Sequence, residues 1–282
     1  MFKLEKNKLF KRRIIQVVIT GIFLLVFVKE IFIHNTYKAY GPGVAASVEN
    51  TGMLWQNFLM VLNGNLLMLP AFIVVSFSGI FSYENRCGMQ DIILSTKNGR
   101  RECTNAKLQL AFIITNLVYA VIIFISVAHM FIVTKGAGCH MEIQTAGILN
   151  DSVFKADYME LVLHMVFLSF ISVNIVLLLV LLVSFLSKNT FVSICIILGI
   201  IYIMRPDILS MFLGMDKAWY IILFAPVNAM NVLDIVRYPP VIISGNIVQW
   251  VYIIELVYSI ILAAGIIFFN TAIAKRQKYY AV

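Results

Sequence analysis

The segment FSYENRCGMQDIILSTKNGRRECTNAK, residues 81–107, is a long charged stretch between two strongly apolar runs. A short apolar cluster, Ile92-Ile93-Leu94, lies at its centre. If the flanking runs cross a membrane, this segment forms a hairpin in the cytoplasm. Apolar side chains exposed in a charged loop indicate a surface that another molecule covers. We therefore interpret residues 83–107 as a docking element.

The composition indicates an integral membrane protein. Of the 282 residues, 61% are hydrophobic and 13% are charged, whereas soluble domains have about 45–50% apolar and about 25% charged residues. The net charge is +8, but the basic residues lie in short flanks of apolar runs. This placement favours topology signals and contact with anionic membrane lipids, and it argues against a nucleic-acid partner.

Six apolar runs predict six transmembrane helices in an all-α fold. The predicted spans are residues 14–33, 58–82, 108–133, 158–186, 190–204 and 247–274. About twenty residues, at about 1.5 Å each, just cross a hydrocarbon layer of about 30 Å. Pro70 predicts a kink in the second span, since proline removes a backbone hydrogen bond from a helix.

Two further segments are expected at the membrane surface. Residues 1–13 combine six Lys/Arg with apolar residues, which predicts an N-terminal interfacial helix; a solvated basic tail is the alternative. Residues 205–246 are apolar, but they are interrupted by prolines, Pro226 among them, before they reach spanning length. They predict re-entrant or interfacial helices, with helix over 219–236 broken near Pro226, and a compact soluble loop is the alternative.

The distribution of basic residues predicts the orientation. Fifteen Lys/Arg flank one side of the six runs and seven flank the other. Because Lys and Arg are enriched in cytoplasmic loops, the richer side is expected to be cytoplasmic. Both chain termini are then inside, and residues 34–57, 134–157 and 205–246 are outside.

Motifs of catalysis and nucleotide binding do not occur in the sequence. It contains no GxxxxGK[ST], HExxH or GxSxG pattern, so we expect no enzymatic activity in this chain. The four cysteines, Cys87, Cys103, Cys139 and Cys195, include no CxxC pair. We therefore expect no disulfide framework, no zinc site and no cofactor bound by this chain.

Glu255 is the acidic residue that lies well inside a predicted span. A carboxylate in lipid costs a few kcal/mol, so its side chain should face protein or water. One interpretation is a polar residue on a translocation path. The alternative is a structural pair with Lys29 or Arg205, which are expected at a similar depth.

Other polar residues near the outer span ends are expected at the lipid surface. Lys29 and Glu30 lie near the end of the first span, where long side chains can extend towards the headgroups. His129 and His164 lie in the outer halves of their spans, and contact with polar headgroups is the expected role of both.

The hairpin resembles that of one transporter family. The pattern Glu84-x-x-x-Gly88, Ile92-Ile93-Leu94-Ser95 and Arg100 is similar to permease subunits of bacterial type-2 ATP-binding cassette (ABC) exporters. In that family, a coupling helix between the second and third spans contacts the ATPase subunit. The six spans, the N-terminal amphipathic segment, the apolar helices before the last span and the motif Ala225-Pro226-Val227-Asn228 are similar as well. Lys97-Asn98-Gly99 stands where many members have a proline.

The resemblance implies a site, partners and a location. The ATPase-docking residues would be Asp91, Ile92, Ile93, Leu94 and Ser95, and the hairpin base would comprise Glu84, Gly88, Arg100 and Arg101. The partners would be an ABC ATPase subunit, which binds ATP and Mg²⁺, and a second permease half, identical or homologous. The complex would lie in the bacterial cytoplasmic membrane and export a peptide, lipid or drug-like cargo.

Two alternatives belong to other functional classes. One is a non-transporting membrane sensor or immunity subunit that binds a peptide antibiotic. The other is an ion-coupled secondary carrier, which is disfavoured because carriers need several charges inside the membrane and Glu255 is the main one recognised in the sequence.

Overall fold

The computed structural model describes the helical body of the chain. The described residues are 13–40, 48–82, 99–145, 147–150, 152, 154–187, 189–204, 208, 211–212, 223–237, 241–243 and 246–278. Three predictions therefore lie wholly or largely outside the described residues: the interfacial helix at 1–13, the coupling segment at 83–98 and the apolar segment at 213–222.

Long α-helices dominate the described residues. They are α2 (Arg13–Tyr40), α3 (Val48–Leu66), α4 (Leu69–Phe77), α7 (Gly99–Thr134), α8 (Tyr158–Leu186), α9 (Thr190–Ile203) and α13 (Trp250–Lys278). The shorter elements are the 3-10 helices η2 (Ile143–Thr145), η3 (Gly147–Leu149) and η4 (Asn228–Met230), the helix α12 (Val232–Ile235) and the strands β1 (Val241–Ile243) and β2 (Asn246–Val248).

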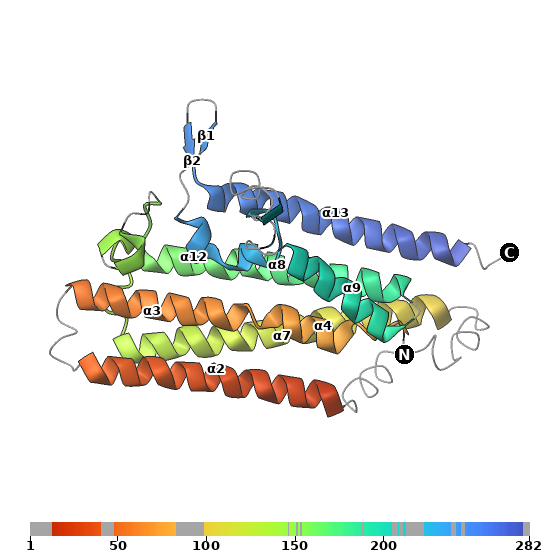
Figure 1. Ribbon diagram of the computed structural model, residues 1–282, viewed down its shortest axis with the longest axis horizontal. Helices are drawn as coiled ribbons and strands as arrows, with labels where there is room; N and C mark the ends of the chain where they lie inside the picture. Colours follow the sequence, from red (N-terminus) through yellow and green to blue (C-terminus); the bar gives the residue numbers. More distant parts are fainter. Residues whose placement is uncertain are drawn as a thin grey trace.

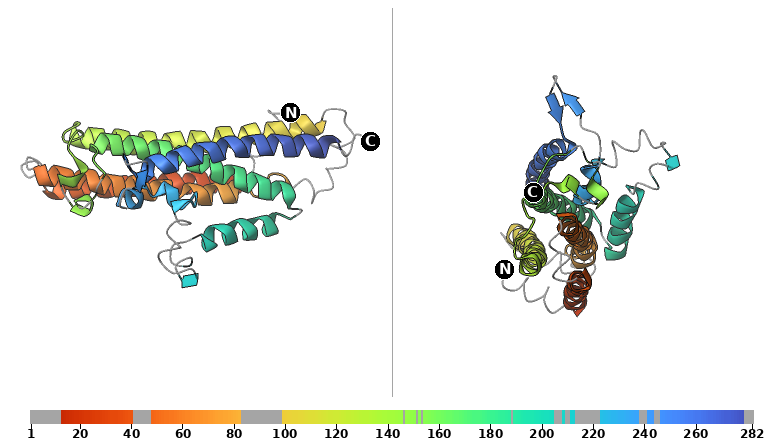
Figure 2. Two further views of the ribbon diagram at one scale, coloured as in Figure 1. Left: turned by 90° about the horizontal axis from the view of Figure 1, so that it is seen from above. Right: turned by 90° about the vertical axis from the view of Figure 1, so that its left-hand side faces the viewer.

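The long helices run side by side, and α8 lies at the centre of the bundle (Figures 1 and 2). It packs against α13, α4, α7 and α9, which explains why apolar residues cover its whole circumference. We call the end where α7 ends and α8 begins, joined by residues 135–157, the loop end. The opposite end, where α2 and α7 begin and α13 ends, is the terminal end.

Four helices among the described residues are long and apolar enough to cross a membrane: Thr51–Phe77, Cys103–Thr134, Tyr158–Leu186 and Trp250–Phe268. The expectation of a mostly helical membrane protein is thus confirmed. Six spans remain a prediction, because α2 and α9, which contain the first and fifth predicted spans, are not among the four. The 14 residues of α9 reach about 21 Å at about 1.5 Å per residue, less than the hydrocarbon thickness.

The helix bounds differ from the predicted spans wherever a helix continues into polar sequence. α8 covers the predicted 158–186. α7, however, begins at Gly99, so the hairpin predicted at 83–107 is shorter by nine helical residues. α2 continues to Tyr40 and α3 begins at Val48, so most of the outer loop predicted at 34–57 is helical. Apolar runs mark the part of a helix that suits lipid, and polar residues prolong the helix beyond it.

Pro70 interrupts the second predicted span, as the sequence indicated. α3 ends at Leu66, Leu67 and Met68 form a turn, and α4 begins at Leu69 with the proline in its first turn. The Met68 N–H donates to the Asn65 carbonyl at 3.3 Å, and the Phe72 N–H donates to the Met68 carbonyl at 3.2 Å. The proline has no N–H to give, so the hydrogen-bond ladder breaks and restarts around it.

The segment before α13 corrects two predictions. Within residues 223–237, helix is confined to residue 223, η4 and α12, so no continuous helix runs through 223–236; residues 219–222 of the predicted helix lie outside the described residues. Ala229, Met230, Val232 and Leu233 are buried, and η4 and α12 pack on α8, α3 and α13. This part therefore packs into the bundle. β1 and β2 then form an antiparallel hairpin that projects away from the helices (Figure 1), which adds a small sheet to an expected all-α fold.

The loop at 135–157 folds back over α3 at the loop end. Trp55 is buried, stacks on Tyr158 and donates its indole N–H to the Ala137 carbonyl at 2.9 Å. Gly138 follows with φ +76°, and a Cβ built on it would lie 2.4 Å from Thr51 Cγ2. A side chain at this position is therefore strained and sterically blocked.

We expect Gly138→Ala to lower the free energy of unfolding by about 2–4 kcal/mol, because backbone strain and overpacking add. The measurement is the thermal unfolding midpoint of the purified chain in detergent. Gly21→Ala in α2 is the matched control, since a Cβ there would meet nothing within 4 Å, and it should leave the midpoint unchanged or slightly raised. Equal midpoints for Gly138→Ala and Gly21→Ala would contradict this packing.

Candidate functional site

Two glutamate–histidine pairs lie inside the bundle near its loop end. Glu30 on α2 meets His129 on α7, with 2.8 Å between Oε2 and Nδ1. Glu255 on α13 meets His164 on α8, with 2.7 Å between Oε1 and Nδ1. His129 lies five residues before the end of α7, His164 six residues after the start of α8 and Glu255 five residues after the start of α13. All three are therefore about 8–9 Å inside their helix ends.

The Glu30 cluster consists of Glu30, Asn65, Ser126 and His129. Ser126 Oγ donates to Glu30 Oε1 at 2.7 Å, and the Asn65 amide Nδ2 lies 3.4 Å from the same oxygen and 3.2 Å from Ser126 Oγ. Glu30 is 4% exposed and Asn65 is fully buried. A buried carboxylate is tolerated only where donors replace water, and this cluster supplies them.

Local helix geometry explains why these residues meet. Ser126 and His129 are three residues apart on α7, so they lie on one face of that helix and turn together towards α2. Asn65 stands in the last turn of α3, just before the break made by Pro70. The expectation that Glu30 extends towards lipid headgroups is wrong, because the carboxylate is buried among these three partners.

Lys29 lies beside the Glu30 cluster. Its Nζ is 3.1 Å from where a Cβ on Gly64 of α3 would be, so the missing side chain of Gly64 provides the space for the ammonium group. Lys29 thus lies against α3, and it is half-buried.

The Glu255 cluster consists of Glu255, His164, Glu160 and the rings of Phe154 and Tyr252. His164 lies between two carboxylates, with Nδ1 on Glu255 and Nε2 4.0 Å from Glu160 Oε1. Phe154 and Tyr252 pack edge-on against the imidazole, with ring centroids 5.7 and 5.2 Å away. A protonated imidazole offers an N–H to each carboxylate, whereas a neutral one can serve only one of them.

The pairing of Glu255 corrects the sequence prediction. The sequence predicts Lys29 or Arg205 as the partner. Lys29 lies beside Glu30, Arg205 is outside the described residues, and His164 bonds to the carboxylate of Glu255. His129 and His164 were expected to contact headgroups, and both instead bond to carboxylates inside the bundle. Histidine and glutamate at equal depth on parallel neighbouring helices are a usable signal, but using it requires knowing which helices are neighbours.

Uncharged polar pairs link further helices of the bundle. Asn116 on α7 and Asn174 on α8 exchange two amide hydrogen bonds of 3.1 Å. Asn63 on α3 donates to Asn231, next to α12, at 2.7 Å. Such interhelical bonds in lipid contribute about 0.6–2 kcal/mol each, so we assign them to stability.

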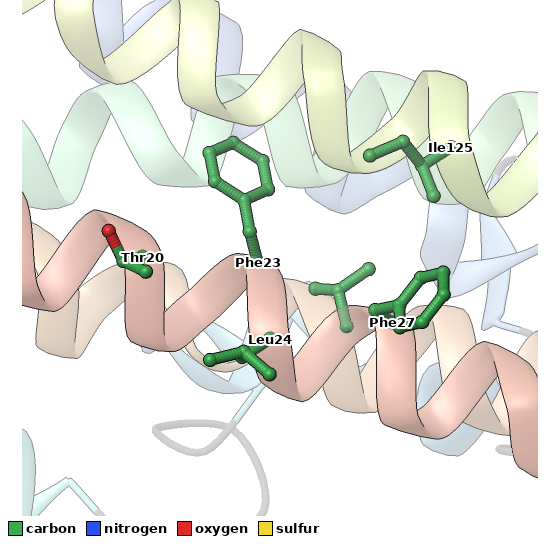
Figure 3. A pocket seen from close by; sticks show the side chains of 6 residues that line it. Thr20, Phe23, Leu24, Phe27 and Ile125 are labelled. Atoms are coloured by element: carbon green, nitrogen blue, oxygen red, sulfur yellow. The ribbon is translucent and has the colours of Figure 1, made fainter.

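An apolar groove runs along α2 where it faces α7 (Figure 3). Its volume is about 380 Å³, and it is lined by Thr20, Phe23, Leu24, Val26, Phe27 and Ile125. The Thr20 hydroxyl already donates to the Gln16 carbonyl at 2.9 Å. With no charged side chain in its lining, the groove suits a hydrocarbon chain better than a polar ligand.

The predicted ATPase-docking site lies mostly outside the described residues. This applies to Asp91, Ile92, Ile93, Leu94 and Ser95, and to Glu84 and Gly88 of the hairpin base. Arg100 and Arg101 belong to the first turn of α7. They lie at the terminal end, whereas His129 lies near the loop end of the same helix.

The helix ends that carry this segment are firmly packed. Ser82 and Thr190 share a hydrogen bond of 2.8 Å between their hydroxyls, and the Phe81 N–H donates to Ser184 Oγ at 3.3 Å. A Cβ on Gly79 would lie 2.9 Å from Thr190 Cγ2, so the turn that follows α4 approaches the start of α9 closely. On the other flank, Lys107 is 2% exposed and places its Nζ 5.4 Å from the Phe81 ring centroid.

No group of three or more His, Cys, Asp or Glu among the described residues could hold a metal ion. Cys103, Cys139 and Cys195 are free thiols. Comparisons with protein-family models, with curated proteins and with solved structures give no match.

Proposed function

We propose that this chain is the membrane-spanning permease subunit of an ABC exporter. It would move a peptide, lipid or drug-like cargo across a bacterial cytoplasmic membrane, using ATP hydrolysed by a separate ATPase subunit. The observation that carries the proposal is the packing of both flanks of residues 83–98, the segment that resembles a coupling element. A coupling element has to be rigidly joined to the helices that it moves.

The contacts of the two flanks support this role. Phe81 and Ser82 are bonded to the end of α8 and the start of α9, and Lys107 of α7 lies over Phe81. Cys103 and Ala106 are buried. The part of α7 that precedes its apolar run is therefore packed as well. α7 continues from this point to the loop end as one 36-residue helix. A displacement of the segment would therefore reach the Glu–His region through a rigid element.

The proposed orientation has the terminal end in the cytoplasm. In a variant without its four native cysteines, single cysteines replacing Asn98 or Lys278 should be shielded from an impermeant thiol reagent in intact cells. Cysteines replacing Val48 or Ile148 should react. The reason is the bias of basic residues towards the segments expected inside. Labelling at position 98 from outside would overturn the orientation.

One structural observation favours the second candidate, an ion-coupled carrier. It was disfavoured because Glu255 was the main intramembrane charge recognised in the sequence. The structure adds Glu30, which is 4% exposed, and pairs both acids with histidines. Buried acids with titratable partners are typical of proton-coupled carriers, so the functional test has to distinguish ATP from a proton gradient as the energy source.

The test is transport in liposomes that contain the purified chain with its copurified partners. Fluorescent peptide, lipid and cationic drug-like cargos are offered with ATP, with a non-hydrolysable ATP analogue and with a proton gradient alone. The proposal predicts that at least one cargo moves only with hydrolysable ATP. Movement with the gradient alone would support the carrier, and binding of a peptide antibiotic without any movement would support the sensor; either result contradicts the proposal.

A further inference from the structure

The exposure of the polar side chains around Glu30 falls stepwise from the loop-end side to the bundle interior. His34, one turn beyond Glu30 on α2, is exposed, and its ring centroid is 6.0 Å from that of His129. The His129 side chain is 22% exposed. Glu30 is 4% exposed, and Asn65 is fully buried. Titratable groups thus form a continuous series from the surface to a buried amide.

The buried end of this series has an unused acceptor. Asn65 Oδ1 has no hydrogen-bond partner among the described residues, although the side chain is completely buried. Leaving a buried polar atom unsatisfied costs free energy in the folded state. A carboxylate only accepts hydrogen bonds, so ionised Glu30 cannot satisfy this oxygen, whereas protonated Glu30 has an O–H to donate. Rotation of the Asn65 amide about its last torsion would present Oδ1 to that proton.

We infer that Glu30 is a proton-binding site that is loaded from the loop end through His34 and His129. His129 takes up a proton at Nε2 from the His34 side, through water between the two rings, and becomes a cation. It then releases the proton on Nδ1 to Glu30 Oε2 across the 2.8 Å contact and is left neutral, with its proton on Nε2. Asn65 and Ser126 both contact Oε1, so the protonated carboxyl group turns about its last torsion to bring its O–H to Asn65 Oδ1, with Ser126 still donating to the carboxyl group.

The geometry fits a proton and does not fit a metal ion. The contacts from Glu30 to Ser126 and His129 are 2.7 and 2.8 Å, the length of hydrogen bonds. A metal ion held at about 2.3–2.6 Å from each ligand would push its ligand atoms further apart. The polar atoms of the Glu30 cluster already touch one another, so only a proton can be added without opening the cluster.

The charged and titratable surroundings of Glu30 are few. Its own helix contributes Lys29 and His34, and α7 contributes His129. α4 contains no titratable residue, and Glu49, the one on α3, is more than four helical turns from Asn65. The nearest other groups of α7 are Tyr119, two turns away, and Lys107 at the terminal end. Proton uptake at Glu30 is therefore governed by Lys29, His34 and His129.

This inference goes beyond the proposed function, because a permease driven by ATP needs no proton site. The test uses the full chain in lipid nanodiscs without an ATPase or cargo. Infrared difference spectra between about pH 8 and pH 5 record the C=O stretch of protonated carboxyl groups. A band in the wild type should be lost in Glu30→Gln and kept in Glu142→Gln, the control on the exposed loop. Asn65→Leu should shift the frequency of this C=O band, because protonated Glu30 loses its hydrogen bond to Asn65 Oδ1.

The uptake route has its own readout. After a rapid pH drop, the C=O band of Glu30 should reach the same final intensity in His34→Gln as in the wild type. The rate at which it appears should be lower by about tenfold or more, since one relay group is missing. If Glu30→Gln does not accumulate as folded protein, Ser126→Ala replaces it and should shift the band by removing one donor from Oε1. Superimposable spectra of the wild type and Glu30→Gln, or of the wild type and Ser126→Ala, would overturn the proton site. Equal rates in His34→Gln would overturn the route.

Discussion

Replacing Ile93 or Leu94 with aspartate is expected to release the ATPase subunit and abolish transport, while the chain stays folded and inserted. An apolar anchor buried at an interface contributes about 2 kcal/mol or more, and a buried unpaired carboxylate adds a further cost. Retention of the ATPase should therefore fall by about thirtyfold or more. The measurement is the amount of ATPase that copurifies with each variant at equal chain level.

Arg86→Ala is the control for the aspartate variants. Arg86 is expected at the rim of the docking surface, where charged residues contribute little to binding, so its replacement should change ATPase retention much less. The thermal midpoint of each variant, measured alone, verifies that the chain is folded. Full transport and full retention of the ATPase by both aspartate variants would refute docking through Ile92-Ile93-Leu94.

The second large effect concerns the Glu255 cluster. His164→Leu should lower the free energy of unfolding by about 3 kcal/mol, because it leaves the carboxylate of Glu255 without its 2.7 Å partner inside the bundle. The double variant with Leu at 164 and 255 should regain most of this loss, since it removes the stranded charge. Unfolding of the purified chain by increasing SDS in mixed detergent micelles measures all variants.

Glu160→Gln is the matched control for this cycle. Glu160 is about half exposed and 4.0 Å from His164, and exposed ion pairs contribute about 0–1 kcal/mol. Its replacement should therefore change the unfolding free energy by less than about 1 kcal/mol. A double variant that is as unstable as His164→Leu alone would show that lost packing, and not an unpaired charge, dominates at this site.

The sequence predicted the helical membrane class and one helix in full, because these depend on hydrophobicity. α8 is apolar around its circumference and sits at the bundle centre, so the apolar run and the helix coincide at 158–186. α2 and α7 carry polar residues at their ends and continue beyond the apolar run. Hydrophobicity reports what lipid tolerates, whereas hydrogen bonding of the backbone decides where a helix ends.

The Glu–His pairs could not be predicted, because each pair joins helices that are distant in sequence. His129 and Glu30 are 99 residues apart, and His164 and Glu255 are 91 residues apart. Hydrophobic periodicity shows which face of a helix is buried but not which helix lies against it. Glu30 in particular looked like a residue at a span end, because the predicted span stopped at 33 while α2 continues to Tyr40.

The segment at 205–246 shows a second limit of the composition argument. Its apolar residues predicted contact with lipid, but Ala229, Met230, Val232 and Leu233 contact the bundle interior. Burial in lipid and burial in protein require the same residue types, so composition cannot separate them. The turn residues around Pro226 and Asn231 allow the chain to fold back onto α3 and α8.

The proteins that copurify with this chain test directly whether it is a permease with a separate ATPase. The tagged chain is purified from its native membrane in mild detergent, and its partners are identified and quantified by mass spectrometry. We expect a protein with the GxxxxGK[ST] motif, present at about one copy per permease half and lost in the Leu94→Asp variant. A chain that purifies without any nucleotide-binding subunit, in the wild type and in the variant alike, would contradict the claim.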